Sequence, residues 1–526
     1  MTRTQNSFYN LITGILTNFL IVVLNFVTRM VFVRSLGTSY LGIEGLFTNV
    51  LSLLSLAELG FGAAIVFKLY KPIEEGDEQR IRVLIKLYRR AYAVIGAVIV
   101  AAGLCLIPAL PHLVRDYERF AELGLNAVVI FLIYLVNSAC SYWFFAYKAE
   151  LVTAYQKSYI INLVNNVVSI ASSITQILVL VYTRNFLLYL AVRIVFTILL
   201  NLVCAAVCDR RYPFIRERTS ESVSREERRD FFRDCASLFL YRANDVVIGA
   251  SDNIVLSKLL GLTYVGLYSN YLAVKVSLRN LLSYFTYSLQ ASLGSIYSTG
   301  KLEWSRLMYR VEKFASAWLF GVAAIGTALL LDDFITLWLG PDYVVNSWTY
   351  GDTVIHTPVA LLVGIELYFV GQQYDCSTFR SAMGLFQKAK LRPVASILVN
   401  LAVSIAAVPY IGIAGVVVGT IVSGVTTTLI VDPIVIHKYG LQQPAWPDFL
   451  RSIGYIALLT AAGFLCRWVC GRIPWEGIVG FIVHGILCVL IPSAVFTLCF
   501  FRTQEFRFLW NAVLDILHLT PDNTAE

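Results

Sequence analysis

The chain has 526 residues, of which 58% are hydrophobic and only 14% are charged, and its formal net charge is +8. Soluble domains carry about 25% charged residues, so this composition excludes an ordinary soluble multidomain protein. Apolar windows of about 20 residues, the length that crosses a bilayer as a helix, recur from end to end. The alternation over about ten residues that is typical of a transmembrane β-strand is absent. The sequence therefore predicts an all-α polytopic membrane protein.

About 14 transmembrane helices are predicted, and the first of them begins near the N-terminus without a signal-peptide cleavage site. The predicted spans are 9–33, 40–70, 84–108, 123–147, 159–182, 186–207, 235–259, 264–296, 309–331, 353–376, 391–409, 412–436, 451–470 and 477–501. The interval 209–233, between the sixth and seventh spans, is the longest charged stretch.

Lysine and arginine are distributed as this span count requires. With a cytoplasmic N-terminus, and with residues at span ends counted in the adjoining loops, 30 of the 42 Lys and Arg residues fall on the cytoplasmic side, 6 fall in outer loops and 6 lie deeper within spans. This asymmetry is what the positive-inside rule predicts. We therefore expect a multi-pass protein with both termini in the cytoplasm. Because this excess on one face accounts for the net positive charge, we expect no nucleic-acid partner.

A repeated turn indicates internal symmetry. The nine residues Arg34–Gly42 (RSLGTSYLG) align without gaps on Lys258–Gly266 (KLLGLTYVG), and a weaker third copy begins at Tyr410. The offset between the first two copies superimposes spans 1–6 on spans 7–12. Because six is even, the two halves have the same topology and are related by a pseudo-twofold axis along the membrane normal. Parallel repeats of this kind occur in secondary transporters, with the substrate site between the halves.

This repeat predicts the domain organisation. The predicted segments are an N-terminal six-helix bundle (1–208), a cytoplasmic charged linker (209–233), a C-terminal six-helix bundle (234–436), helices 13 and 14 (437–501) and a cytoplasmic amphipathic tail (502–526).

Ionisable residues inside spans are costly, so they usually face a bundle interior or a wet cavity. The cations predicted to line a central cavity are Arg29, Arg242, Lys275 and Arg279. Such a cavity suits an anionic head group, because arginine binds phosphate oxygens bidentately. The polar and ion-coupling candidates are Asn25, Glu58, Asn165, Asp245, Asp252 and Glu366.

A structural interpretation of these charges stays open. Arg242 and Asp245 share one helix face and would pair to lock helices together, and Asp252 would hold the corner between spans 7 and 8. Glu44 and Arg34, near the outer ends of their spans, are expected at the membrane interface.

Enzymatic motifs are lacking in the sequence. It contains no phosphate-binding loop of the G-x-x-x-x-G-K-[ST] type, and its five histidines are dispersed. We expect no enzyme activity and no cofactor. The cysteine pairs 204/208 and 466/470 have a spacing that shares a helix face, but a free cysteine in an apolar segment is usually a small hydrophobe, so no metal site is predicted.

Three stretches carry a family resemblance: SLGTSYLGIEGLFTNVLSLLSLAELGFGAAIVFKLYKPIEEGDEQRIRVLIKLYRRAY, SDNIVLSKLLGLTYVGLYSNY and GIAGVVVGTIVS. Together they resemble the polysaccharide-transporter branch of the multidrug/oligosaccharidyl-lipid/polysaccharide exporter superfamily. The resemblance extends over most of residues 1–436, while the last two spans and the tail match in placement only.

The resemblance implies two six-helix bundles around a central cavity, two extra helices and alternating access in the bacterial cytoplasmic membrane. It implies a flippase for undecaprenyl-pyrophosphate-linked oligosaccharide repeat units of a capsule, an O-antigen or a similar surface polymer. It also implies polysaccharide polymerase and export proteins as partners, and coupling to protons or sodium through Glu58, Glu366 or Asp245. The chain departs from a purely cationic cavity, because Asp245 and Asp252 share the face of Arg242.

Two other functions are compatible with the same scaffold. An ion-coupled multidrug or small-cation exporter would have an acidic and aromatic cavity rather than one rich in arginine and lysine. A membrane enzyme of polymer assembly would place catalytic residues in outer loops, whereas this chain concentrates its unusual charges within spans.

Overall fold

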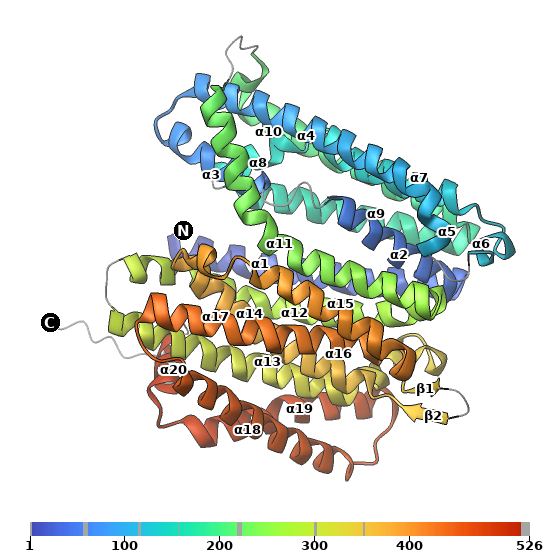
Figure 1. Ribbon diagram of the computed structural model, residues 1–526, viewed down its shortest axis with the longest axis vertical. Coiled ribbons are helices and arrows are strands. Elements are labelled where there is room, and N and C mark those ends of the chain that lie inside the picture. Colours follow the sequence, from blue (N-terminus) through green and yellow to red (C-terminus); the bar gives the residue numbers. More distant parts are fainter. Residues whose placement is uncertain are drawn as a thin grey trace. The chain divides into compact units, whose positions relative to one another are not determined.

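The structure is a computed structural model that describes residues 3–55, 61–113, 117–155, 157–217, 223–298, 302–350 and 353–516. The described chain is almost entirely helical, which confirms the predicted all-α class (Figure 1). It divides into two compact units, Met1–Gly266 and Leu267–Glu526, with the boundary inside one helix.

The first unit contains eleven complete helices among its described residues. They are α1 (Arg3–Leu36), α2 (Thr38–Leu54), α3 (Phe61–Glu74), α4 (Glu78–Leu106), α5 (Leu110–Leu113), α6 (Arg119–Glu122), α7 (Ala127–Trp143), α8 (Tyr147–Ala154), α9 (Ser158–Thr183), α10 (Phe186–Arg211) and α11 (Arg225–Leu259). Helix α1 packs against α9, α4 packs against α7, and α10 packs against both α7 and α9.

Side-chain caps define where three of these helices begin. The carboxylate of Asp77 accepts a hydrogen bond from the backbone N–H of Arg80, and Asn126 and Asn185 cap α7 and α10 in the same way. Short polar side chains satisfy backbone N–H groups that have no partner within the helix. These caps mark the residues at which a loop ends and α4, α7 or α10 begins.

The chain bends near the end of the predicted span 123–147. Helices α7 and α8 meet at an angle of 43°, at a break that includes Phe145 with a φ of 62°. The predicted span 40–70 covers most of α2 and α3, and residues 56–60, which connect them, lie outside the described part of the chain.

The repeated turn has the same backbone geometry in its first two copies. Gly37 precedes α2 with a φ of 94°, and the equivalent Gly261 precedes α12 (Leu262–Ser298) with a φ of 105°. Both values lie in the region that glycine occupies without steric cost. The identical glycines of the two sequence copies therefore make the same sharp change of direction.

The second unit is organised on α13 (Leu302–Trp338), which packs against α14, α18, α19 and α20. Its other helices are α14 (Val359–Ala382), α15 (Arg392–Ile411), α16 (Ala414–Ser423), α17 (Leu429–Val435), α18 (Trp446–Cys470), α19 (Gly477–Phe500) and α20 (Gln504–Ile516). Strands β1 (Ser347–Tyr350) and β2 (Thr353–His356) form an antiparallel hairpin. Figure 1 shows α18 and α19 side by side, and an aromatic cluster centred on Phe314 and Phe496 joins them to α13.

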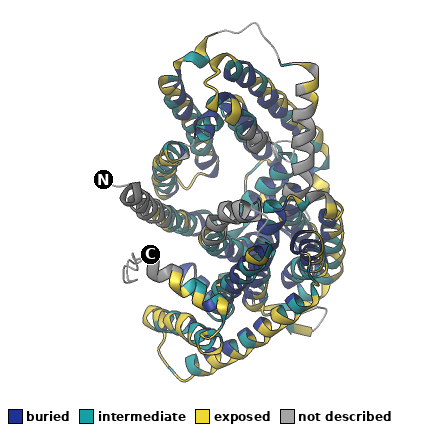
Figure 2. Cartoon of the chain, turned by 90° about the vertical axis from the view of Figure 1, so that its left-hand side faces the viewer, coloured by how far each residue is buried: buried dark blue, intermediate teal, exposed yellow. Residues whose placement is uncertain are grey.

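Eight described helices are long and apolar enough to cross a membrane, and the bent pair α7–α8 makes a ninth candidate. The predicted total of 14 stays a prediction, since α1, α11, α12 and α14, which carry charges of the predicted cavity, are not among these candidates. Large apolar side chains such as Leu163 and Phe464 are exposed on candidate spans, as a lipid-facing surface requires. Figure 2 shows the buried residues on the faces that helices turn toward one another.

Candidate functional site

The predicted cavity cations belong to both units. Arg29 lies on α1 in the first unit, and Lys275 and Arg279 lie one turn apart on α12 in the second unit. Arg242 lies on α11, but its side chain is outside the described part of the structure.

In the first unit, one carboxylate is shared by cations from two helices. The Nη1 atom of Arg193 on α10 lies 3.1 Å from Oε1 of Glu44 on α2. The hydroxyl of Tyr189 donates a hydrogen bond of 3.4 Å to the same oxygen. Arg29 on α1 also interacts electrostatically with Glu44 and with Tyr189. The guanidinium of Arg193 lies over the ring of Tyr134, 5.7 Å from its centroid.

This group, which we call the Arg29–Glu44–Arg193 cluster, contains two guanidinium groups and one carboxylate and has a net charge of +1. Arg29, Glu44 and Arg193 are half-buried, so their charges act on one another through a medium of lower dielectric constant than water. Glu44, which the sequence predicts near the membrane interface, pairs with a cation of another helix. The sequence shows that Arg193 is a charge within the predicted span 186–207, but it does not show that Glu44 is its partner.

In the second unit, Lys275 is neutralised by an acidic residue. Its Nζ atom lies 2.7 Å from Oε1 of Glu366 on α14, and both residues are buried. Two predicted site residues therefore come together, although the sequence assigned one to substrate binding and the other to polar or ion-coupling roles. A buried pair of this kind is strongly destabilised when only one partner is removed.

Arg279, one turn further along α12, is half-buried, and its Nε atom is buried without a hydrogen-bond acceptor among the described residues. A buried donor left without an acceptor loses about 1–3 kcal/mol of hydration. An external anion at this position would supply the missing acceptor.

The remaining predicted residues have different surroundings. Asn25 is exposed on α1, Asn165 is half-buried on α9, and Asp252 is buried on α11. Glu58 lies outside the described residues, and the side chain of Asp245 is likewise not described.

Two buried acids in the second unit were not among the predicted site residues. Glu312 on α13 and Asp375 on α14 are each 2% exposed and interact with one another. None of their four carboxylate oxygens has a well-oriented hydrogen bond from the described chain, although the hydroxyl of Ser316 comes near Asp375. Hydropathy puts both near the ends of their spans, and their proximity follows only from the packing of α13 against α14.

Other buried acids nearby have cationic partners. Lys313 pairs with Asp448, which also accepts a hydrogen bond from Tyr309, and Arg380 pairs with Asp432. These pairs connect α13 to α18 and α14 to α17. Glu312 and Asp375 differ from them in forming no ion pair in the described part of the chain, and Lys313, which acts on Asp375 electrostatically, is paired with Asp448.

Three cysteines form a sulfur-rich group between α18 and α19. The Sγ atoms of Cys466, Cys470 and Cys488 lie within 4.8 Å of one another, and those of Cys466 and Cys488 are 3.5 Å apart. Sulfur ligands suit soft metal ions. Cys466 and Cys488 also belong to the aromatic cluster around Phe314, where they pack as small apolar side chains.

Comparisons with known proteins give a family and a fold. The sequence model of a family described as "Polysaccharide biosynthesis protein" matches residues 4–292. No curated protein sequence matches the chain.

Among solved structures, "Lipid II flippase MurJ, inward closed conformation" has a TM-score of 0.63 and 15% identity, over 93% of this chain and 100% of that chain. An inward-facing "multidrug resistance MATE family transporter of the MOP superfamily" has a TM-score of 0.59 and 14% identity, over 80% of this chain and 96% of that chain. An outward-facing conformation of such a transporter has a TM-score of 0.55 and 14% identity, over 82% of this chain and 94% of that chain. These similarities identify an all-helical transporter fold.

Proposed function

Because the chain belongs to the polysaccharide biosynthesis protein family, we propose that it is a flippase for lipid-linked oligosaccharides. Its substrate is an oligosaccharide repeat unit on undecaprenyl pyrophosphate, which it moves from the inner to the outer leaflet of the bacterial cytoplasmic membrane for surface-polysaccharide export. Both termini lie in the cytoplasm, and polymerase and export proteins act on the translocated unit.

The physical problem is the transfer of a charged, sugar-bearing head group across about 30 Å of hydrocarbon. A polar protein interior removes most of the desolvation penalty of the head group, while the lipid tail stays in the bilayer. Alternating access then exposes the same charged side chains first to one leaflet and then to the other.

The observation that carries this proposal is the buried Nε atom of Arg279, which has no acceptor among the described residues. Pyrophosphate oxygens match the fork of donors on a guanidinium group. The Arg29–Glu44–Arg193 cluster supports the proposal, because its net positive charge attracts an anion. Lys275 contributes less, because Glu366 neutralises it.

The test is translocation by purified protein in liposomes that contain undecaprenyl-pyrophosphate-linked oligosaccharide. We expect Arg279→Gln to reduce translocation about tenfold or more, since a hydrogen bond to a charged group contributes about 1.5–3 kcal/mol. Arg467→Gln is the matched control, because Arg467 is exposed on α18. Translocation by Arg279→Gln at the wild-type rate would contradict the proposed role of Arg279, and no translocation by the wild-type protein would contradict the flippase assignment.

A second candidate function is an ion-coupled multidrug or small-cation exporter. Its specific support is the buried pair Glu312 and Asp375, because carboxylates without cationic partners suit a cation. Drug-resistance profiles of a deletion strain separate the two functions. An exporter predicts increased sensitivity to cationic drugs with normal surface polymer, and a flippase predicts loss of polymer.

A further inference from the structure

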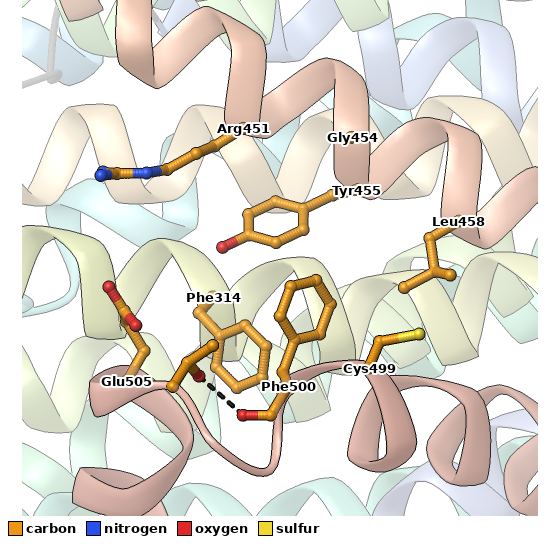
Figure 3. Close-up of a pocket in the computed structure, with 9 residues that line it drawn as sticks. Phe314, Arg451, Gly454, Tyr455, Leu458, Cys499, Phe500 and Glu505 are labelled. Carbon is orange, nitrogen blue, oxygen red and sulfur yellow. Dashed lines mark hydrogen bonds between the residues drawn. The ribbon is translucent and has the colours of Figure 1, made fainter.

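A groove in the second unit lies where α13, α18, α19 and α20 meet. It has a cavity volume of about 380 Å³, within the range of about 300–1,000 Å³ that small-molecule sites occupy (Figure 3). Helices α18 and α19 are candidate membrane spans, so the groove borders the bilayer. It involves none of the residues assigned above to substrate transport.

The two ends of the groove differ in polarity. Figure 3 shows the guanidinium of Arg451, the hydroxyl of Tyr455 and the carboxylate of Glu505 toward one end. Leu458 and Cys499 lie toward the other end, with the ring of Phe500 between the two. A ligand that fills this groove has a polar head and an apolar body.

The charges at the polar end favour an anion. Glu505 is already paired with Arg310, at 3.3 Å between the carboxylate and Nε. Asp448, the other acid that acts on the hydroxyl of Tyr455, is paired with Lys313. Arg451 is exposed and has no hydrogen-bond or ion-pair partner within the described ranges. The three cations and two acids have a net charge of +1; they are Arg310, Lys313, Arg451, Asp448 and Glu505.

We propose that this groove binds an anionic glycerophospholipid of the surrounding bilayer. The guanidinium of Arg451 donates hydrogen bonds to the phosphate, and the first carbons of an acyl chain lie along Phe500 and Leu458 toward Cys499. A head group with a charge of −1 neutralises the polar end, whereas a zwitterionic head group leaves the positive charge uncompensated. Phosphatidylglycerol therefore fits better than phosphatidylcholine.

The shape of the groove depends on a glycine. Gly454 lies one turn from Arg451 and Leu458 on the same face of α18, and a Cβ atom added to it would meet no atom within 4 Å. A larger side chain at this position therefore projects into open space without straining the helix. Gly454→Leu fills the groove with the protein's own atoms and excludes an acyl chain.

The experiment measures lipid binding to the purified full-length protein in detergent. Native mass spectrometry counts bound lipid, and thermal unfolding reports stabilisation by added phosphatidylglycerol, phosphatidylcholine or glycerol phosphate. We expect phosphatidylglycerol to bind and to stabilise the protein. Phosphatidylcholine lacks the net negative charge and glycerol phosphate lacks the acyl chain, so each should bind at least about tenfold more weakly.

Arg451→Gln and Gly454→Leu should each weaken phosphatidylglycerol binding about tenfold or more, through loss of a charged hydrogen bond and through steric exclusion respectively. The matched controls are Arg467→Gln and Ala457→Leu, which change exposed positions of the same helix outside the groove. Unchanged thermal unfolding of all four variants without lipid establishes that they fold.

Equal binding of phosphatidylglycerol and phosphatidylcholine would overturn the proposal. So would phosphatidylglycerol binding that neither groove variant reduces. Stabilisation by glycerol phosphate that equals stabilisation by phosphatidylglycerol would identify a site for a soluble anion instead of a lipid.

Discussion

Gly42 and Gly266 occupy equivalent positions in the two copies of the repeated turn, and each lies against the backbone of the other copy. A Cβ atom on Gly42 would lie 2.0 Å from the carbonyl oxygen of Leu262, and one on Gly266 would lie 2.4 Å from the carbonyl oxygen of Thr38. Thr38 and Leu262 are themselves equivalent, so the contact is reciprocal, as a local twofold axis requires. The repeat in the sequence thus appears as a symmetric contact between the starts of α2 and α12.

This contact predicts that Gly42→Ala and Gly266→Ala both destabilise the protein. The added methyl group would meet backbone atoms, which cannot move aside as a flexible side chain can, and overpacking of this kind costs about 1–3 kcal/mol. Thermal unfolding of the purified protein measures the effect.

Gly249→Ala is the control for these variants, because it changes a glycine within α11 whose Cβ would meet no atom within 4 Å. Alanine stabilises a helix interior by about 0.5–1 kcal/mol relative to glycine, so this variant should unfold at the same or a higher temperature. Equal unfolding temperatures for all three variants would argue against the close contact.

The Arg29–Glu44–Arg193 cluster predicts that transport and stability respond differently to its members. In Arg29→Gln, Arg193 still neutralises Glu44, so the protein should fold while the net charge of the cluster falls from +1 to 0. We expect translocation to decrease about tenfold, which corresponds to about 1.4 kcal/mol. Translocation assays and thermal unfolding of the same preparation separate the two effects.

Arg193→Lys is the companion variant. It preserves the charge but removes the planar group that lies over Tyr134, and lysine is not equivalent to arginine at such sites. Translocation that stays at the wild-type level in Arg29→Gln but fails in Arg193→Lys would show that packing, rather than net charge, matters here.

The buried pair Lys275–Glu366 predicts a non-additive pair of substitutions. Lys275→Met leaves the carboxylate of Glu366 without its partner and should cost about 3–5 kcal/mol of stability. The double variant Lys275→Met/Glu366→Leu removes both charges and should recover most of that loss. Thermal unfolding of the two single variants and the double variant gives the coupling between the residues.

Transport by the double variant then reports the role of Lys275. A stable double variant that still translocates substrate assigns the pair to folding. A stable variant without translocation assigns Lys275 or Glu366 to transport.

Glu312 and Asp375 should tolerate loss of charge better than their paired neighbours. An ionised carboxylate buried without a partner is costly, so Glu312→Gln and Asp375→Asn should leave stability within about 1 kcal/mol of the wild type or increase it. Asp448→Asn should cost about 3–5 kcal/mol, because it leaves the buried Lys313 unpaired.

The same variants test ion coupling in proteoliposomes. If the two acids carry the coupling cation, Glu312→Gln should abolish the response of translocation to a proton or sodium gradient. An unchanged response in both Glu312→Gln and Asp375→Asn would exclude the pair from coupling.

The sequence by itself determined the helical membrane class and the geometry of the repeated turn. Both depend on features local to a few tens of residues: apolar runs long enough to cross hydrocarbon, and glycines that permit a positive φ. Gly37 and Gly261 adopt nearly the same φ because the residues around them are nearly the same.

The tertiary structure decided which charge meets which partner. Lys275 pairs with a residue 91 positions away, and Arg193 with one 149 positions away, so no reading of a single span reveals either pair. The rotation of each helix and its packing against its neighbours set these distances. For the same reason only the packed helices distinguish Lys275, which Glu366 neutralises, from Arg279, whose buried Nε has no acceptor in the described chain.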